Sequence, residues 1–351
     1  KEDETGLAWF CVSTQPSVKP PDFKDEDGKA KTLLTYSDWL ENVRYAYKSG
    51  AESKEFNANA KQVRNQLKQK FTCSGQGTAF RPFYEQLVSS LKLPADFDSD
   101  LQTFSSGFHF IFPSFFQLIV ELIAKKREFG IVFRTFGTDI HEIGEEMSLF
   151  AQGKHPLHPG FVCDGRSDKS RTACSYTLNS HDKSRVGTFF RNGLEQKDTK
   201  LFMGTLDQPS SPADVDYYQN KQHTTLAATG YEQVYQFVKD NISGPERILG
   251  LRDYYPWWRD NSESDGSGKL LVVDDTDPDV HPIFFDDNIE RDRKHIVDVR
   301  LLHNGTELSL AEANELYIVR AEPSLAITDK NYFIDAVARC EANRQRRLSP
   351  V

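Results

Sequence analysis

The sequence predicts an α/β fold with a mainly parallel sheet. Its first indication is the continuous apolar run LAWFCV, residues 7–12, which is typical of a strand buried on both faces. A second short strand, residues 131–133, follows a Phe-rich helix and leads through a polar turn into a helix from Ile140. Such helix–strand–turn–helix units build α/β sheets. Further strands are expected in RILGLRDYY and HPIFFDD.

The remaining elements follow from periodicity. Apolar residues at helical spacing predict helices over residues 37–48, 57–69 and 80–91, and later in GYEQVYQFVKDNI and NYFIDAVARCEANRQRR. Residues 153–220 carry little helical periodicity and are rich in Gly, Ser, Asp, Lys and His. They include the hairpin-like VGTFFRNG…KLFMGTL, and we interpret them as a loop-rich insertion.

Composition excludes several functional classes. The 351 residues are 38% hydrophobic and 27% charged, as in an ordinary globular protein, and the formal charge of -9 argues against a nucleic-acid binder. No apolar run approaches the roughly 18 residues needed to span a bilayer, so no membrane partner is expected. The five cysteines are odd in number and contain no CxxC pair, which favours a reducing, cytoplasmic location over disulfides.

The sharpest chemical signal is HPIFFDDNIERD. Asp286 and Asp287 end an apolar run, and Asp292 follows five residues later. Adjacent carboxylates repel each other, so carboxylates at the tip of a core strand usually have a cation nearby. The alternative is an acidic, helix-capping turn. Below, these three aspartates are the acidic motif.

Polar turns follow the strand candidates at residues 11–15, 134–139 and 286–292. The carboxyl ends of parallel strands share one edge of a sheet, where open α/β sheets hold their ligands. The pattern resembles the haloacid dehalogenase (HAD) superfamily of phosphatases and phosphotransferases. That resemblance implies a HAD-like Rossmannoid three-layer sandwich. The core would be residues 1–34, 111–150 and 231–351, with a helical cap-like insertion at 35–110 and a loop-rich insertion at 151–230.

The resemblance also assigns roles to residues. The family's (G/D)Dx3-4D motif, which holds magnesium, matches the acidic motif. A Thr or Ser that binds phosphate at a strand end matches Thr135. A basic residue that neutralises charge matches Lys269 in SGKLLVV, with Arg252 as the second candidate.

The family's first motif, DxDx(T/V), is where this chain departs from the pattern. Its two aspartates are the nucleophile and the acid/base, and WFCVSTQ places Cys11 and Ser13 at those positions. A thiol is a soft ligand for a hard cation, and a hydroxyl cannot donate a proton as a carboxylic acid does. We therefore expect a degenerate catalytic site with weak or absent Mg²⁺ binding.

These observations leave several functions open. The first is a pseudophosphatase acting as a binding, scaffold or regulatory protein, with a phosphorylated small molecule or a protein as partner. The second is an active Mg²⁺-dependent HAD-type phosphatase with unusual nucleophile chemistry. A third is a carboxylate-rich metal-binding protein of another α/β family. Separately, His155, His158 and Cys163 in GKHPLHPGFVC form either a metal site or a rigid proline-bound loop.

Overall fold

The computed structural model describes residues 9–18, 22–24, 27–29, 33–46, 48, 53–95, 97, 102–165, 174–209 and 215–348. The chain divides into two compact units, residues 1–90 and 91–351. Across these described ranges, no helix has both the length and the apolar character needed to cross a membrane.

The smaller unit is helical. It contains α1 (Tyr36–Trp39), which continues as a π-helical turn (Leu40–Arg44), α2 (Lys54–Gln69) and α3 (Arg81–Ser90). Thr35 caps α1, because its side chain accepts a hydrogen bond from the Asp38 N–H while Asp38 accepts one from the Thr35 N–H. The helices expected in this region are therefore present.

The strand expected at residues 7–12 is wrong for the part that the structure describes. Residues 9–12 form no strand, while Leu7 and Ala8 lie outside the described residues. Trp9 instead joins an aromatic cluster of the helical unit, with ring centroids 5.2 Å from Tyr36 and 5.9 Å from Phe71. Its neighbour Phe10 is 70% exposed. Trp9 thus packs on aromatic side chains of the helical unit rather than within a sheet.

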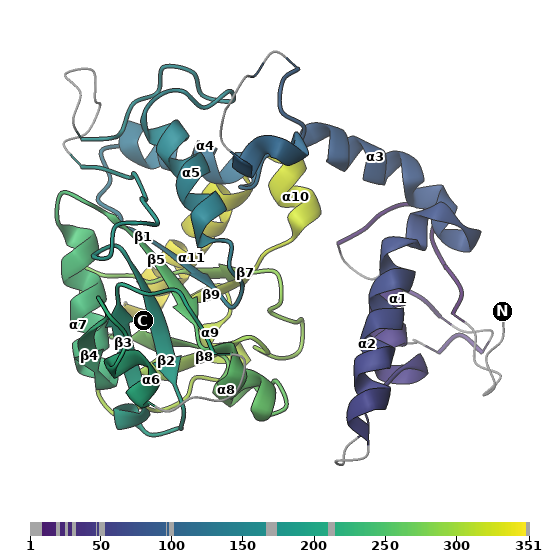
Figure 1. The fold of residues 1–351 in the computed structure, drawn as a ribbon. Coiled ribbons are helices and arrows are strands. Elements are labelled where there is room, and N and C mark those ends of the chain that lie inside the picture. Colours follow the sequence, from purple (N-terminus) through teal and green to yellow (C-terminus); the bar gives the residue numbers. More distant parts are fainter. Residues whose placement is uncertain are drawn as a thin grey trace. The chain divides into compact units, whose positions relative to one another are not determined.

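The larger unit contains a five-stranded sheet in the order β1-β5-β2-β3-β4 (Figure 1). Its strands are β1 (Ile131–Thr135), β2 (Val186–Arg191), β3 (Thr199–Met203), β4 (Thr225–Thr229) and β5 (Ile248–Asp253). β5 is parallel to both β1 and β2, whereas β3 is antiparallel to β2 and β4. The expected strands at residues 131–133 and in RILGLRDYY and the expected hairpin are all present.

Two further strand pairs are both parallel. β6 (Lys269–Val273) pairs with β8 (Val297–Leu301), and β7 (Phe284–Asp286) pairs with β9 (Ile318–Arg320). The prediction of an α/β fold with a mainly parallel sheet is confirmed at this level. The region expected to be the second insertion, residues 151–230, differs from that expectation because it supplies β2, β3 and β4 to the central sheet.

Helices cover both faces of β5. Ile248 packs in one core cluster with α4 (Pro113–Ala124) and α5 (Ile140–Ala151), while Leu249 and Leu251 pack in another with α7 (Gly230–Ser243). This alternation follows from the two-residue period of a strand. The remaining helices are α6 (Val215–Gln219), α8 (Tyr255–Asp260), α9 (Leu310–Ala313), α10 (Pro323–Thr328) and α11 (Tyr332–Leu348).

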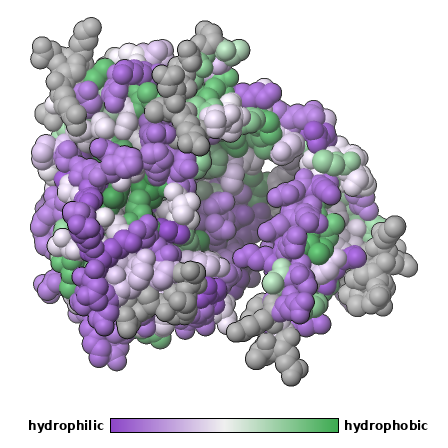
Figure 2. Space-filling view, viewed as in Figure 1, coloured by the Kyte–Doolittle hydropathy of each residue, from purple (hydrophilic) through white to green (hydrophobic). Residues whose placement is uncertain are grey.

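The surface and the interior differ as expected for this layering. Hydrophilic side chains dominate the face shown in Figure 2. Trp258, in α8, is buried in a core cluster with Val273 and Val299. The aromatic sequence YYPWW therefore supplies core packing here.

The close packing of α5 on β5 gives a first prediction. A Cβ at Gly250 would lie 2.7 Å from Ile140 Cγ2 and 3.3 Å from Leu178 Cδ2. Gly250→Ala should therefore lower the free energy of unfolding by about 1–3 kcal/mol through overpacking, measured by urea denaturation. Gly266→Ala is the control, since its nearest atom would be 3.7 Å away. Equal stability of the two variants would contradict this packing.

Candidate functional site

Charged and polar side chains gather where the C-terminal ends of β1, β5 and β7 approach the start of β6. We call this group the strand-end cluster, and it consists of Arg134, Thr135, Arg252, Asp253, Lys269 and Asp286. Four of these, namely Thr135, Arg252, Lys269 and Asp286, are residues that the sequence predicts for the site.

Lys269 and Asp286 form a buried ion pair. Lys269 Nζ lies 2.9 Å from Asp286 Oδ2, and the two side chains are only 7% and 8% exposed. The ammonium also donates a hydrogen bond of 3.3 Å to the Arg134 carbonyl and lies 5.3 Å from the Phe136 ring centroid. The start of β6 thereby connects the ends of β1 and β7. The cation expected beside the acidic motif is a side chain of the chain itself.

A second buried pair, Arg134 with Asp253, was not predicted. Arg134 Nε donates to Asp253 Oδ2 at 2.9 Å, and its Nη2 donates to the other carboxylate oxygen, so the contact is bidentate. Arg134 Nη1 also donates to the Leu270 carbonyl at 2.8 Å. The guanidinium lies 4.1 Å from the Phe189 ring centroid, within cation–π range. The sequence signal for this pair was the presence of charged residues in or at the end of the otherwise apolar strands IVFRT and ILGLRD.

Thr135 uses its hydroxyl in a local turn. The hydroxyl donates to Asp139 Oδ1 at 2.6 Å and accepts from the Gly137 N–H at 2.8 Å. This turn leads directly into α5, for which Asp139 is the N-cap position. A phosphate at this strand end would have to compete with Asp139 for the hydroxyl proton.

Arg252 also binds backbone groups. Its Nη1 donates to the Leu206 carbonyl at 2.9 Å and its Nε to the Phe136 carbonyl at 3.4 Å. Burial lowers the pKa of its guanidinium. Between the two sequence candidates for the basic residue beside the acidic motif, the structure brings Lys269 to Asp286.

Of the acidic motif, only Asp286 belongs to the strand-end cluster. Asp286 Oδ1 accepts hydrogen bonds from the Asn288 N–H at 2.9 Å and from its side-chain amide at 3.2 Å, which closes a turn after β7. Asp287 and Asp292 are exposed. Among the residues that the structure describes, the three aspartates do not form a group with ligand atoms close enough for one metal ion.

Asp287 is exposed as a residue, yet its carboxyl is partly desolvated. This desolvation raises the pKa of Asp287, and the neighbouring charge of Asp286 raises it further. The nearby charges of Lys269 and Arg320 lower the pKa of Asp287, but they do not outweigh these two effects.

A cavity of about 10 Å³ borders the strand-end cluster at Asp253, and Phe136, Ser267 and Leu270 also line it. This volume holds about one water molecule.

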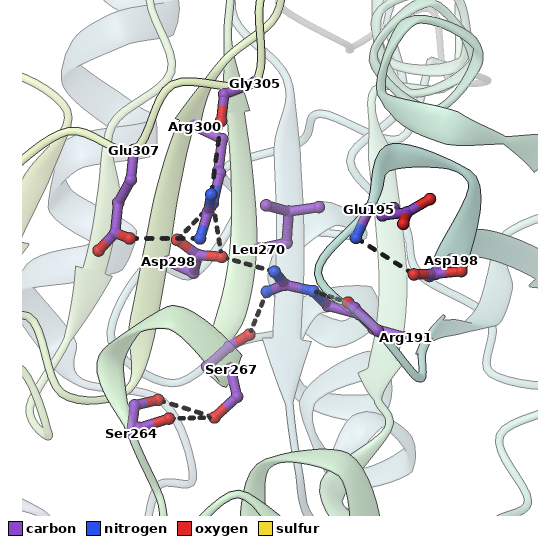
Figure 3. Close-up of polar contacts among 12 residues, drawn as sticks. Arg191, Glu195, Asp198, Ser264, Ser267, Leu270, Asp298, Arg300, Gly305 and Glu307 are labelled. Atoms are coloured by element: carbon purple, nitrogen blue, oxygen red, sulfur yellow. Dashed lines mark hydrogen bonds and ion pairs between the residues drawn. The ribbon is translucent and has the colours of Figure 1, made fainter.

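A second buried charge network lies beside the strand-end cluster (Figure 3). Arg191, at the end of β2, pairs with Asp298 of β8 at 2.7 Å, and Asp298 also pairs with Arg300 at 2.9 Å. Arg191 Nη1 donates to the Gly268 carbonyl at 3.4 Å, next to the start of β6. These contacts fix β2 against β8, so their role is structural.

Cys11 and Ser13 do not lie on a strand of the sheet that carries Thr135. Both belong to the smaller unit, in a segment without strand structure. The Cys11 thiol donates to the Ser13 carbonyl at 2.7 Å, and the Ser13 hydroxyl donates to the Gln15 carbonyl at 3.1 Å. The expectation that Cys11, Thr135 and Asp287 share one sheet edge is therefore wrong, because the segment of Cys11 is not a strand of that sheet.

No protein-family model matches the chain, and neither the curated proteins nor the solved structures contain a significant match.

The Lys269–Asp286 pair gives a second prediction. Asp286→Asn should lower the free energy of unfolding by about 3–5 kcal/mol, because it leaves a buried ammonium without an anion. The double variant Lys269→Met with Asp286→Leu should recover most of that loss, measured by urea denaturation. Glu290→Gln, in the more exposed pair with Arg293, is the control and should cost about 1 kcal/mol or less. A loss in Asp286→Asn no larger than in this control would contradict a buried pair.

A third prediction concerns pH. The pKa of Asp287 is higher in the folded state than in the unfolded state. At pH values just above the ordinary pKa of an aspartate, the folded protein therefore binds more protons than the unfolded chain. The free energy of unfolding falls as pH rises through this range. Asp287→Asn should remove this slope and raise stability near pH 7 by less than about 1 kcal/mol. Thermal unfolding from about pH 4 to pH 7 measures it, with exposed Asp292→Asn as the control. A less stable Asp287→Asn protein near pH 7 would refute the assignment.

Proposed function

We propose that this chain is a pseudophosphatase with a HAD-like core, which acts as a binding, scaffold or regulatory protein. The observation that carries the proposal is the internal charge compensation of the strand-end cluster. Asp286 is paired with Lys269, and Asp253 is paired with Arg134. A carboxylate that already has a buried side-chain cation has little demand for a magnesium ion.

The position of β1 suggests a different alignment of the family's first motif. In the family, magnesium is shared by carboxylates of the first and fourth motifs, so the first motif must lie on a strand end that meets Asp286. Lys269 bonds to both Asp286 and the Arg134 carbonyl, which supports β1 as that strand. In RTFGT, Arg134 and Phe136 then occupy the positions of the two aspartates, in place of Cys11 and Ser13.

This alignment removes the nucleophile and the general acid of phosphoryl transfer. Arg134 is a cation and cannot attack phosphorus, and the Phe136 ring cannot donate a proton to a leaving group. Thr135 then lies within this first motif, and its hydroxyl is engaged by Asp139.

A protein without turnover acts through what it binds. A phosphorylated ligand at the strand-end cluster would compete with Asp253 for Arg134 and with Asp286 for Lys269. This competition favours a protein partner over a phosphorylated small molecule. A reducing, cytoplasmic location is part of the proposal and agrees with the odd number of cysteines and the lack of a CxxC pair.

A fourth prediction tests the proposal on a broad panel of phosphate esters. With saturating Mg²⁺, the wild-type chain should turn over none of them, since loss of the nucleophile alone typically costs about 10⁴-fold or more in rate. Continuous phosphate release is the measurement, and an unrelated magnesium-dependent phosphatase is the positive control. Chelation of Mg²⁺ should leave the background unchanged.

The same panel can refute the proposal. Robust wild-type turnover that both Thr135→Ala and Asp287→Asn abolish would establish an active Mg²⁺-dependent phosphatase at this strand end. Loss of that turnover in Cys11→Ser would restore the thiol as the nucleophile. Retention by Arg134→Lys of the wild-type rate would exclude β1 as the catalytic strand.

A further inference from the structure

Three chelating side chains meet inside the larger unit, away from the strand-end cluster. They are His109, which precedes α4, Glu146 of α5, and His155, which follows α5. Their residues are 6%, 0% and 0% exposed. The His155 ring centroid lies 4.3 Å from that of Phe116, a core residue of α4, so the group sits in apolar surroundings.

The three ligand atoms are already close to the spacing that a metal ion requires. Glu146 Oε1 lies 2.9 Å from His109 Nδ1 and 3.0 Å from His155 Nε2, and all three atoms lie within 4.8 Å of one another. Tetrahedral zinc, with bonds of about 2.0–2.2 Å, separates its ligand atoms by about 3.3 Å. The two contacts of Glu146 would lengthen by a few tenths of an ångström, and the two imidazole nitrogens already lie within 4.8 Å of each other.

The second carboxylate oxygen fixes the orientation of Glu146. Glu146 Oε2 accepts hydrogen bonds from the Phe110 N–H at 2.8 Å and the Ile111 N–H at 2.7 Å. Outer hydrogen bonds of this kind hold metal-binding carboxylates in place. Oε1 is thereby directed at the two imidazoles.

Glu146 differs from the other buried carboxylates in the described parts of the chain. Asp253, Asp277 and Asp298 each pair with a Lys or Arg side chain, whereas the ion pairs of Glu146 are both with histidines. The Glu146 carboxylate is therefore bordered by two side chains that can themselves ligate a metal ion.

Each imidazole presents a lone pair toward Glu146 when its proton is on the outer ring nitrogen. His109 Nε2 is buried and has no hydrogen-bond partner among the described residues. His155 Nδ1 accepts only a long contact of 3.4 Å from the Leu157 N–H. A metal ion bound at Glu146 Oε1 requires His109 Nδ1 and His155 Nε2 without protons, so each ring would carry its proton on the outer nitrogen.

We infer that His109, Glu146 and His155 form a structural site for a divalent transition metal of the zinc class. Two imidazoles and one carboxylate suit Zn²⁺ and Co²⁺ rather than Mg²⁺. Burial of the group leaves no open path for a substrate, so the metal would join the segment before α4 to the middle of α5 and to the segment that follows it. Of the sequence GKHPLHPGFVC, only His155 takes part; His158 and Cys163 do not belong to the group. The inference does not depend on the proposed function.

The test uses the full chain refolded with Zn²⁺ or Co²⁺ and then passed through a column with a weak chelator, because a buried site fills best during folding. The wild type should retain one metal ion per chain, and Co²⁺ should give the visible absorption of nitrogen and oxygen ligands. Glu146→Gln and His155→Asn should each lower metal affinity at least about tenfold. Circular dichroism checks that each variant folds.

The control is a histidine pair on the surface of the same unit. His141 and His181 have ring centroids 5.4 Å apart, and His141 Nε2 lies 3.4 Å from Glu145. The variant His141→Asn with His181→Asn should bind metal as the wild type does. A wild-type chain that retains neither metal would overturn the inference, even if Glu146→Gln does not fold. So would equal metal loss in the surface variant and in His155→Asn.

Discussion

Buried ion pairs join sheets that share no backbone hydrogen-bond ladder in the described residues. The five-stranded sheet, the β6–β8 pair and the β7–β9 pair are separate. Arg134 connects β1 to β5 and to the backbone of β6, Lys269 connects β6 to β7, and Arg191 connects β2 to Asp298 of β8. Breaking any of these pairs leaves an uncompensated buried charge, so the three sheets hold one arrangement. The same pairs occupy the place where a catalytic site would require free carboxylates.

Sequence patterns predicted several strands from their apolar runs. The runs around residues 131–133 and 248–253 are apolar because helices cover both faces of the sheet there. β8 escaped prediction because Asp298 and Arg300 interrupt its apolar run, and only the folded structure shows that each has a partner. The run at residues 7–12 was wrongly predicted as a strand because a short apolar run alone does not distinguish a buried strand from another packed segment. Trp9 of this run packs on Tyr36 and Phe71.

Residues of the candidate site could be predicted only where a local sequence pattern marked them. The apolar run followed by paired aspartates indicated Asp286, and a cation beside it was expected on electrostatic grounds. Arg134 and Asp253 are 119 positions apart, so no local pattern connects them. Glu146 looked like an ordinary residue of an amphipathic helix, and its burial between two histidines depends on tertiary packing.

The order of strands in the central sheet has a consequence for folding. β1 pairs with β5, and their first partners, Ile131 and Ile248, are 117 positions apart (248 − 131). Parallel pairing over such a separation is slow, because loop closure precedes the contacts that stabilise it. During synthesis at about 5–20 residues per second, β1 emerges roughly 6–23 s before its partner. In that interval its apolar edge is open to other chains, so chaperone binding to nascent β1 would protect the fold before its sheet exists.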